Sequence, residues 1–240
     1  MAMIQTTKAI VINTIKYGDT SLIATCYTEK YGVKTYMLKG ILTSKKSTIK
    51  LAYFQPLMVL NLTANHNNKG ALNFIKDVEV LNFNHSIYST IKKQTIALFL
   101  AEIVYYSIRE EEENSQLFQY LETSFLWLET HDNCSNFHLL FLLNLTKFLG
   151  FYPEMKAVNT SYFDLTEGSF TKENKFNAVS GENLVQFKKL LGINFDVLHE
   201  VDFSAANRQA ILSILIQYFE LHLSGFKKPK SLTVLKAVFS

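Results

Sequence analysis

A chain of 240 residues, 48% of them hydrophobic, is long enough to bury one large core or two modest ones. The formal net charge of +3 is too small for bulk charge to attract a polyanion, so any affinity for nucleic acid depends on where the lysines lie. Cys26 and Cys134 stand far apart in apolar surroundings, which favours reduced, buried thiols over a disulfide framework or a zinc knuckle.

The first third of the chain has a strand pattern. Its β-branched and aromatic residues fall in short runs separated by turn residues. Five strands are predicted, over Thr7–Ile15, Ser21–Thr28, Val33–Leu38, Leu57–Thr63 and Leu72–Val80. This is the size of an OB-type barrel, in which closure removes the free edges of an open sheet. The alternation of Ile10 and Ile12 against Ala9 and Val11 is imperfect for a strand with one buried face.

Beyond Asn84 the hydrophobic period becomes that of helices, as Ile96, Leu100, Ile103 and Val104 show. Helices are predicted over Ile91–Glu112, Ser115–Glu129, Ser135–Leu149, Gly181–Leu191, Ala205–Leu223 and Ser231–Val238. Three of them end at a glycine suited to closing a helix, at Gly150, Gly192 and Gly225.

Between these helices, residues 161–176 favour a small β hairpin turning at Thr166-Glu167-Gly168. The sequence therefore predicts an α+β protein. An N-terminal five-stranded OB-type β barrel takes residues 1–83, and an α-helical domain with a hairpin insert at 157–181 takes residues 84–240. The boundary is short and apolar, so we expect the two parts to pack together.

The most apolar stretches, around Glu102 and Lys147, are shorter than the roughly 20 residues that span a bilayer and are interrupted by those charges. The N-terminus lacks the pattern of a signal peptide. We expect no membrane association and a cytoplasmic location.

Several short motifs follow one another in a particular order along the chain. They are Thr7-Lys8-Ala9-Ile10-Val11, Tyr17-Gly18-Asp19-Thr20-Ser21, Tyr27-Thr28 with Tyr31-Gly32, Lys39-Gly40, Phe54-Gln55-Pro56-Leu57, Phe148-Leu149-Gly150-Phe151-Tyr152-Pro153, and the stretch from Arg208 through Tyr218 to Lys230-Ser231-Leu232-Thr233-Val234-Leu235. In this order and spacing, the chain resembles the RecO family of recombination mediators over its whole length.

The resemblance implies a bacterial, nucleoid-associated DNA-repair protein. Such a protein helps load the recombinase onto single-stranded DNA coated by the single-strand-binding protein, acts with a partner called RecR, and anneals complementary strands. Many relatives carry a four-cysteine zinc site in the hairpin, whereas residues 157–181 here contain neither cysteine nor histidine. We therefore expect no metal, and a hairpin held by the packing of Tyr162, Phe163, Phe170 and Phe176.

Binding of single strands needs cations for the phosphates and aromatic faces for the bases. The lysines predicted to bind DNA all lie in the barrel: Lys34, Lys39, Lys45, Lys46, Lys50 and Lys69. The densest group occupies the long connection from Lys39 to Lys50, and Tyr36 and Tyr53 are candidate stacking platforms. The alternative is that these lysines are ordinary solvated surface and that both tyrosines belong to the core.

Family members also hold the acidic, phenylalanine-ended tail of the single-strand-binding protein in an apolar pocket rimmed by cations. Residues that could form it here are Lys147, Phe148, Phe151, Lys188 and Lys189, although such aromatic residues more often belong to the core.

No catalytic signature such as GxxxxGK[ST], HExxH or GxSxG occurs. Four glutamates in a row, Glu110–Glu113, cannot converge on one ion from a helix end, and favour a solvated helix terminus. The sequence thus predicts a binding protein without cofactor or enzymatic activity. Its alternative is a protein–protein adaptor whose barrel docks partners without contacting DNA.

Overall fold

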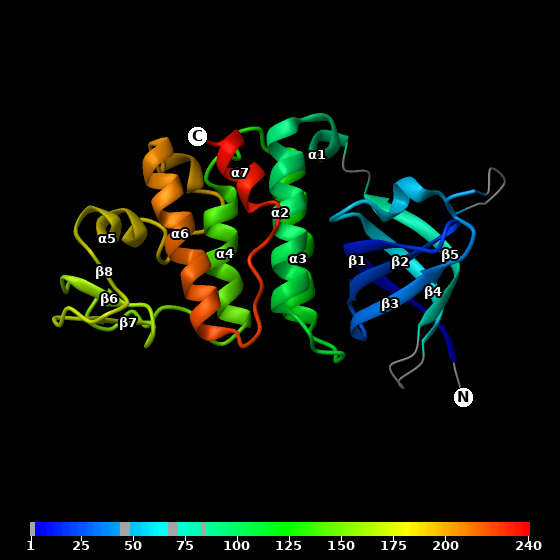
Figure 1. The fold of residues 1–240 in the computed structure, drawn as a ribbon, viewed down its shortest axis with the longest axis horizontal. Coiled ribbons are helices and arrows are strands. Elements are labelled where there is room, and N and C mark those ends of the chain that lie inside the picture. Colours follow the sequence, from blue (N-terminus) through cyan, green and yellow to red (C-terminus); the bar gives the residue numbers. More distant parts are fainter. Residues whose placement is uncertain (1–2, 44–48, 67–71, 83–84) are drawn as a thin grey trace. The chain divides into compact units, whose positions relative to one another are not determined.

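The N-terminal strands close into the predicted five-stranded barrel, with strand order β1-β2-β3-β5-β4 (Figure 1). The structure is a computed structural model that describes residues 3–43, 49–66, 72–82 and 85–240. The strands are β1 (Met3–Tyr17), β2 (Ser21–Thr28), β3 (Gly32–Leu38), β4 (Val59–His66) and β5 (Asn73–Asn82). All neighbouring pairs are antiparallel except β3 and β5, which run parallel and pair only at Tyr36↔Asn73 and Met37↔Phe74.

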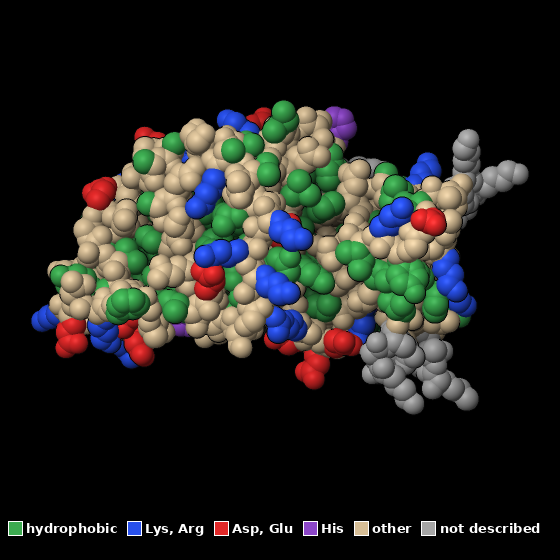
Figure 2. Space-filling model, in the orientation of Figure 1, with side chains coloured by type: hydrophobic (Ala, Val, Ile, Leu, Met, Phe, Trp, Pro, Cys, Tyr) green, Lys and Arg blue, Asp and Glu red, His purple; other side chains and the backbone are tan. Residues whose placement is uncertain are grey.

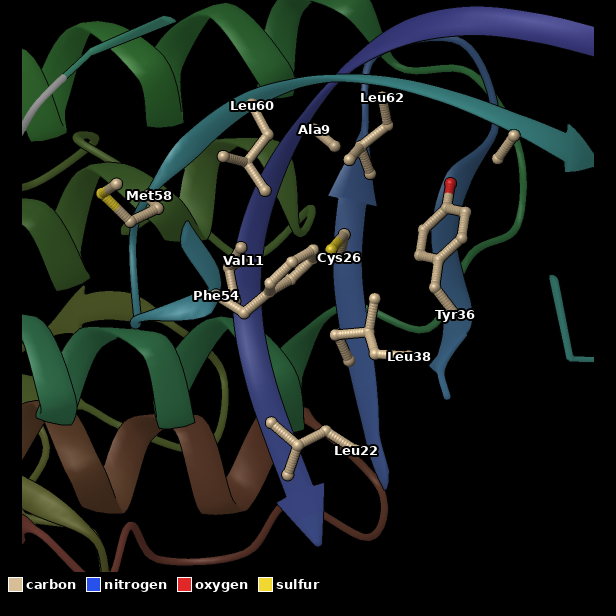
Figure 3. Packing of buried hydrophobic residues seen from close by; sticks show 12 residues of the cluster. Ala9, Val11, Leu22, Cys26, Tyr36, Leu38, Phe54, Met58, Leu60 and Leu62 are labelled. Carbon is tan, nitrogen blue, oxygen red and sulfur yellow. The ribbon is translucent and has the colours of Figure 1, made fainter. Parts of the chain in front are cut away.

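The barrel interior is filled by alternate residues of its strands, as the period of two requires. Ala24 and Cys26 of β2 and Leu60 and Leu62 of β4 are fully buried. Cys26, Leu60 and Leu62 point into the same core (Figure 3). Phe54, from the short 3₁₀ helix η1 (Leu51–Phe54), joins this core. Burial raises the pKa of the Cys26 thiol, so Cys26 behaves as a packing residue.

The middle of β1, residues 9–12, is buried on both faces, which accounts for its imperfect alternation. Ala9 and Val11 belong to the barrel core, while Ile10 and Ile12 on the opposite face are also buried. β1 also contacts helix α2 (Ile91–Ser107). Next to it, the ammonium of Lys8 donates to Glu122 of helix α3 (Ser115–Thr130) over 2.9 Å. The barrel and these two helices therefore pack as one compact unit, Met1–Thr130.

The helix predicted to run to Glu112 ends earlier, at Ser107. The acidic residues that follow pair with the barrel instead of continuing the helix. The backbone N–H of Val33 donates to the carbonyl oxygen of Glu110 over 3.0 Å, and the Lys34 ammonium lies 2.6 Å from a Glu111 carboxylate oxygen. The prediction of a solvated helix terminus is therefore wrong in part: the glutamates are exposed, but they belong to an extended segment bound to β3.

A helix that the sequence pattern missed, α1 (His85–Ser89), follows the barrel. It is only five residues long, and its N-terminal amides at Ser86 and Ile87 donate to the Glu129 carboxylate over 2.7 and 2.9 Å. The buried Lys93 ammonium donates to the Ser86 hydroxyl and to the Glu129 carbonyl oxygen. This network binds α1 to α3.

The second compact unit, His131–Ser240, contains helices and a small sheet. Its helices are α4 (Phe137–Phe148), α5 (Gly181–Lys188), α6 (Ala205–His222) and α7 (Leu232–Val238), with a 3₁₀ turn η2 (Leu198–Glu200). No described helix is both long and apolar enough to cross a bilayer. Cys134 in this unit and Cys26 in the barrel are both buried, and neither forms a disulfide.

The predicted hairpin is confirmed as β6 (Tyr162–Asp164) and β7 (Ser169–Thr171), and β8 (Ala178–Ser180) adds a third strand beside β6. Phe163 is completely buried, and its ring lies 4.9 Å from that of Phe170 and 5.2 Å from that of Phe187. Tyr162 is partly buried. The expectation for Phe176 is wrong: it lies in the turn before β8 and is fully exposed, so it contributes nothing to this packing.

Acid is expected to destabilise the second unit through His138. This imidazole is buried in α4, and burial together with the charge of Arg208 lowers its pKa to about 3. The unfolded chain takes up the proton near pH 6.5, whereas the folded chain does not until about pH 3. Stability from this residue is thus present above pH 6.5, and it falls by about 1.4 kcal/mol per pH unit below that.

Urea denaturation between pH 7 and pH 5, compared with a His138→Gln variant, measures this contribution. The variant should show the shallower pH dependence. Equal slopes in both proteins would contradict the assignment.

Candidate nucleic-acid interface

Two of the predicted lysines stand exposed at the ends of the long connection between β3 and η1. Lys39 directly follows the last residue of β3, and Lys50 directly precedes η1. Their positions follow from the chain order, since the strand ends at Leu38 and η1 begins at Leu51. Lys45, Lys46 and Lys69 lie outside the described residues.

Lys34 does not share this exposure. Its side chain is only 5% exposed and its ammonium lies 2.6 Å from Glu111, so its charge is already paired within the protein. Nearby, Tyr31 stacks on His66 with ring centroids 4.3 Å apart. Burial, with the charge of Lys34, lowers the pKa of His66 below its usual value. The imidazole is therefore neutral near pH 7 and adds no cation to this end of the barrel.

The two tyrosines predicted to be stacking platforms differ in their exposure. Tyr36 is completely buried in the barrel core, where its hydroxyl lies 2.9 Å from Nε2 of His66, so the expectation for Tyr36 is wrong. Tyr53 is partly buried and lines a cavity of about 400 Å³ between η1 and α1, with Met58 and Tyr88 among its walls. The described residues around that cavity include no lysine or arginine.

An aromatic residue that the sequence pattern does not single out lies beside Lys39. Phe74 of β5 is 46% exposed, and the Lys39 ammonium lies 4.9 Å from the centre of its ring. Both line a recess of about 260 Å³ with apolar walls from Met37, Leu38, Ile41, Ile49 and Ile75. Figure 2 shows apolar side chains on the barrel bordered by lysine or arginine side chains.

A β-bulge explains why Phe74 was missed. Thr63 of β4 faces Asp77 and Ala64 faces Ile75, so Lys76 is an extra residue in β5. Strict alternation from the inward Val78 would place Phe74 inside the barrel. The extra residue moves Phe74 to the outer face instead. The local sequence around Phe74 and Lys76 carries no signal that predicts the bulge.

The residues predicted to hold an acidic tail make separate contacts within the second unit. The Lys147 ammonium lies 4.7 Å from the ring centre of Tyr152, that of Lys188 5.3 Å from Phe170, and that of Lys189 5.9 Å from Phe203. The three cations therefore lie over three different rings.

The two phenylalanines of that set are both partly buried. Phe148 is the last residue of α4. The ring of Phe151 stacks on that of His222, with the ring centroids 4.9 Å apart and the ring planes at 6°. Tyr152 connects two of the elements involved, because its hydroxyl accepts from the backbone N–H of Gly192 over 3.1 Å. The structure brings Lys147 and the segment after α5 together, and Phe151 packs against α6 instead.

Among the residues that the structure describes, no group of three or more histidine, cysteine, aspartate or glutamate side chains is arranged to hold a metal ion. In the small sheet, the buried Asp164 is paired with Lys175 at 3.0 Å. Desolvation raises the pKa of its carboxyl, but the hydrogen bonds from Lys175 and from the Thr166 amide outweigh this and hold the pKa below its usual value. A salt bridge and aromatic packing thus hold the small sheet together.

Comparison with known proteins assigns both parts of the chain to one family. The family model described as Recombination protein O N terminal matches residues 1–84, and the one described as Recombination protein O C terminal matches residues 88–232. Proteins named DNA repair protein RecO are similar over nearly their full length. The one from Flavobacterium psychrophilum is 46% identical and that from Flavobacterium johnsoniae 45%, each over 98% of both chains. The one from Bacteroides fragilis is 37% identical over 99% of this chain and 100% of its own. One family model matches the closed five-stranded barrel, and the other matches the helices that follow it. The chain therefore belongs to the RecO family of DNA repair proteins.

Proposed function

We propose that this protein is a non-enzymatic recombination mediator whose barrel binds single-stranded DNA. The observation that carries the proposal is the exposure of Lys39 and Lys50 at the two ends of the connection that also contains Lys45 and Lys46. Lysines along one connection can follow a phosphate backbone without reading its sequence. Lys34 is left out of the proposed contact set, because Glu111 already neutralises it.

The mediator acts with RecR and with the single-strand-binding protein, and it promotes annealing of complementary strands. Its membership in the RecO family supports this part of the proposal. For the acidic tail of the single-strand-binding protein we propose the surface around Lys147 and Tyr152, since Tyr152 joins the end of α4 to the segment after α5 that follows Lys189. Action on chromosomal DNA would place the protein at the bacterial nucleoid.

Removing two lysines from this connection is expected to flatten the salt dependence of DNA binding. Each phosphate contact contributes about −0.7 to the slope of log affinity against log salt for single strands. Lys39→Ala with Lys50→Ala, and separately Lys45→Ala with Lys46→Ala, should each reduce the slope by roughly 1 to 1.5 units. Fluorescence anisotropy of a labelled oligothymidylate at several salt concentrations measures it.

Lys30→Ala serves as the control, because this exposed barrel lysine donates to the carbonyl oxygen of Thr6 and lies in the β2–β3 turn, away from the connection. Its slope should equal that of the unmodified protein. An absence of salt-sensitive DNA binding would overturn the proposal and favour the adaptor that docks only proteins. Turnover of DNA with a divalent metal would contradict the non-enzymatic assignment.

A further inference from the structure

Phe74 is an aromatic residue on the surface of a barrel strand. It is a large apolar side chain left 46% exposed on the outer face, where it pairs with Met37 of β3 and Asn65 of β4. The bulge at Lys76 gives it this orientation, while its neighbour Ile75 packs against the barrel core. The ring is thus held out from the core by a specific irregularity of the strand.

The recess beside Phe74 exists because β3 and β5 are joined at only two positions. Beyond Met37 the two strands no longer pair, and apolar side chains such as Ile41 and Ile49 wall a space of about 260 Å³. Phe74 forms one wall and Lys39 the rim. A flat apolar ring, an apolar recess and one cation thus lie together on the barrel surface.

These three elements match the parts of one nucleotide. A base presents an aromatic face that stacks on an aromatic side chain, and its phosphate needs a cation nearby. The Lys39 ammonium now lies over the ring at 4.9 Å, and its flexible four-carbon stem allows it to move aside to a phosphate. Farther along β5, the exposed carboxylates of Asp77 and Glu79 repel phosphates, although the exposed Lys76 lies between them and Phe74.

We infer that Phe74 is a stacking platform for a base of single-stranded DNA, with Lys39 holding the adjoining phosphate. The inference rests on the proposed function and names one contact within it. It also separates the roles of the two residues: Phe74 recognises the presence of a base, and Lys39 recognises charge.

The test compares two ligands that carry the same phosphates, an oligothymidylate and an abasic oligomer of equal length. The unmodified protein is expected to bind the oligothymidylate more tightly. Phe74→Ala should weaken that binding by about 5- to 150-fold, the range measured for loss of one stacked base, and leave binding of the abasic oligomer nearly unchanged. Phe74→Trp should retain the preference, and Phe74→Leu, which is apolar but has no ring, should lose it.

Lys39→Ala is expected to weaken both ligands alike and to flatten both salt slopes. Phe176→Ala removes another fully exposed ring, in the second unit, and should change neither affinity. A thermal melt followed by Trp127 emission checks that each Phe74 variant is folded.

The outcomes distinguish the two proposals. If Phe74→Ala binds both oligomers as the unmodified protein does, with the salt dependence intact, the stacking platform is overturned and the proposed function stands. Equal weakening of both oligomers also overturns it, because the loss then does not depend on a base. If the unmodified protein binds neither oligomer in a salt-sensitive way, the proposed function itself fails.

Discussion

Replacing Phe163 by alanine is expected to lower the free energy of unfolding of the second unit by about 3–5 kcal/mol. The side chain is completely buried, and its ring lies 5.8 Å from that of Tyr218 of α6 as well as close to Phe170 and Phe187. Truncation leaves a cavity among rings from β7, α5 and α6 that cannot all move inward. Hydrogen exchange of residues 162–171, measured by mass spectrometry in increasing urea, reports the loss.

Phe176→Ala provides the matched control within the same sheet region. Because Phe176 is fully exposed, its truncation is expected to change the stability by no more than about 0.5 kcal/mol. A sheet that tolerates Phe163→Ala but loses protection when a zinc chelator is added would contradict the conclusion that packing holds it.

In the barrel, replacing Gly32 by alanine is expected to lower the free energy of unfolding by about 2–4 kcal/mol. Gly32 has φ of +60°, a conformation that strains any residue with a Cβ. A Cβ there would also overlap the carbonyl oxygen of Glu110 and lie 2.6 Å from that of Glu112. These are backbone atoms, so the acidic segment would have to leave β3 to make room.

Gly18→Ala separates the two contributions. Gly18 also has φ of +60°, but nothing lies within 4 Å of the position of its Cβ, so only the backbone strain of about 1 kcal/mol is expected. Trp127, the single tryptophan, lies in α3 of the same compact unit, and its emission in urea measures both variants. Equal losses at the two glycines would show that the contact with the acidic segment contributes little.

Much of the fold could be predicted from local patterns. β2 begins and ends at the predicted residues Ser21 and Thr28, because alternation and the flanking turn residues act within a few positions. Gly150, Gly192 and Gly225 all have the positive φ expected after a helix. The barrel itself followed from the number and spacing of strands, and its closure is confirmed.

The features that local patterns missed depend on partners far away in the chain. α2 stops at Ser107 because the next residues bond to β3, whose Lys34 is 77 positions from Glu111. The short α1 is held by Glu129, more than 40 positions later, and five residues have little helical stability alone. A window of local sequence contains neither partner.

The candidate site shows the same limit. Lys39 and Lys50 were recognisable as connection lysines, because charge in a polar connection is exposed by default. The pairing of Lys34 and the burial of Tyr36 could not be predicted, since each is decided by how strands close around a common core. Phe74 was hidden by a single extra residue in β5, which reverses every side chain before it.

The hydrogen bond and the salt bridge that join β3 to Glu110 and Glu111 have a consequence for folding during translation. When a ribosome has just completed β5 at Asn82, Glu110 and Glu111 have not yet been synthesised. Until they emerge, the amide of Val33 and the ammonium of Lys34 lack these two partners. During translation these contacts can therefore form only after α2 has left the ribosome, so the segment that contains all the contacts of β3 extends beyond the strands.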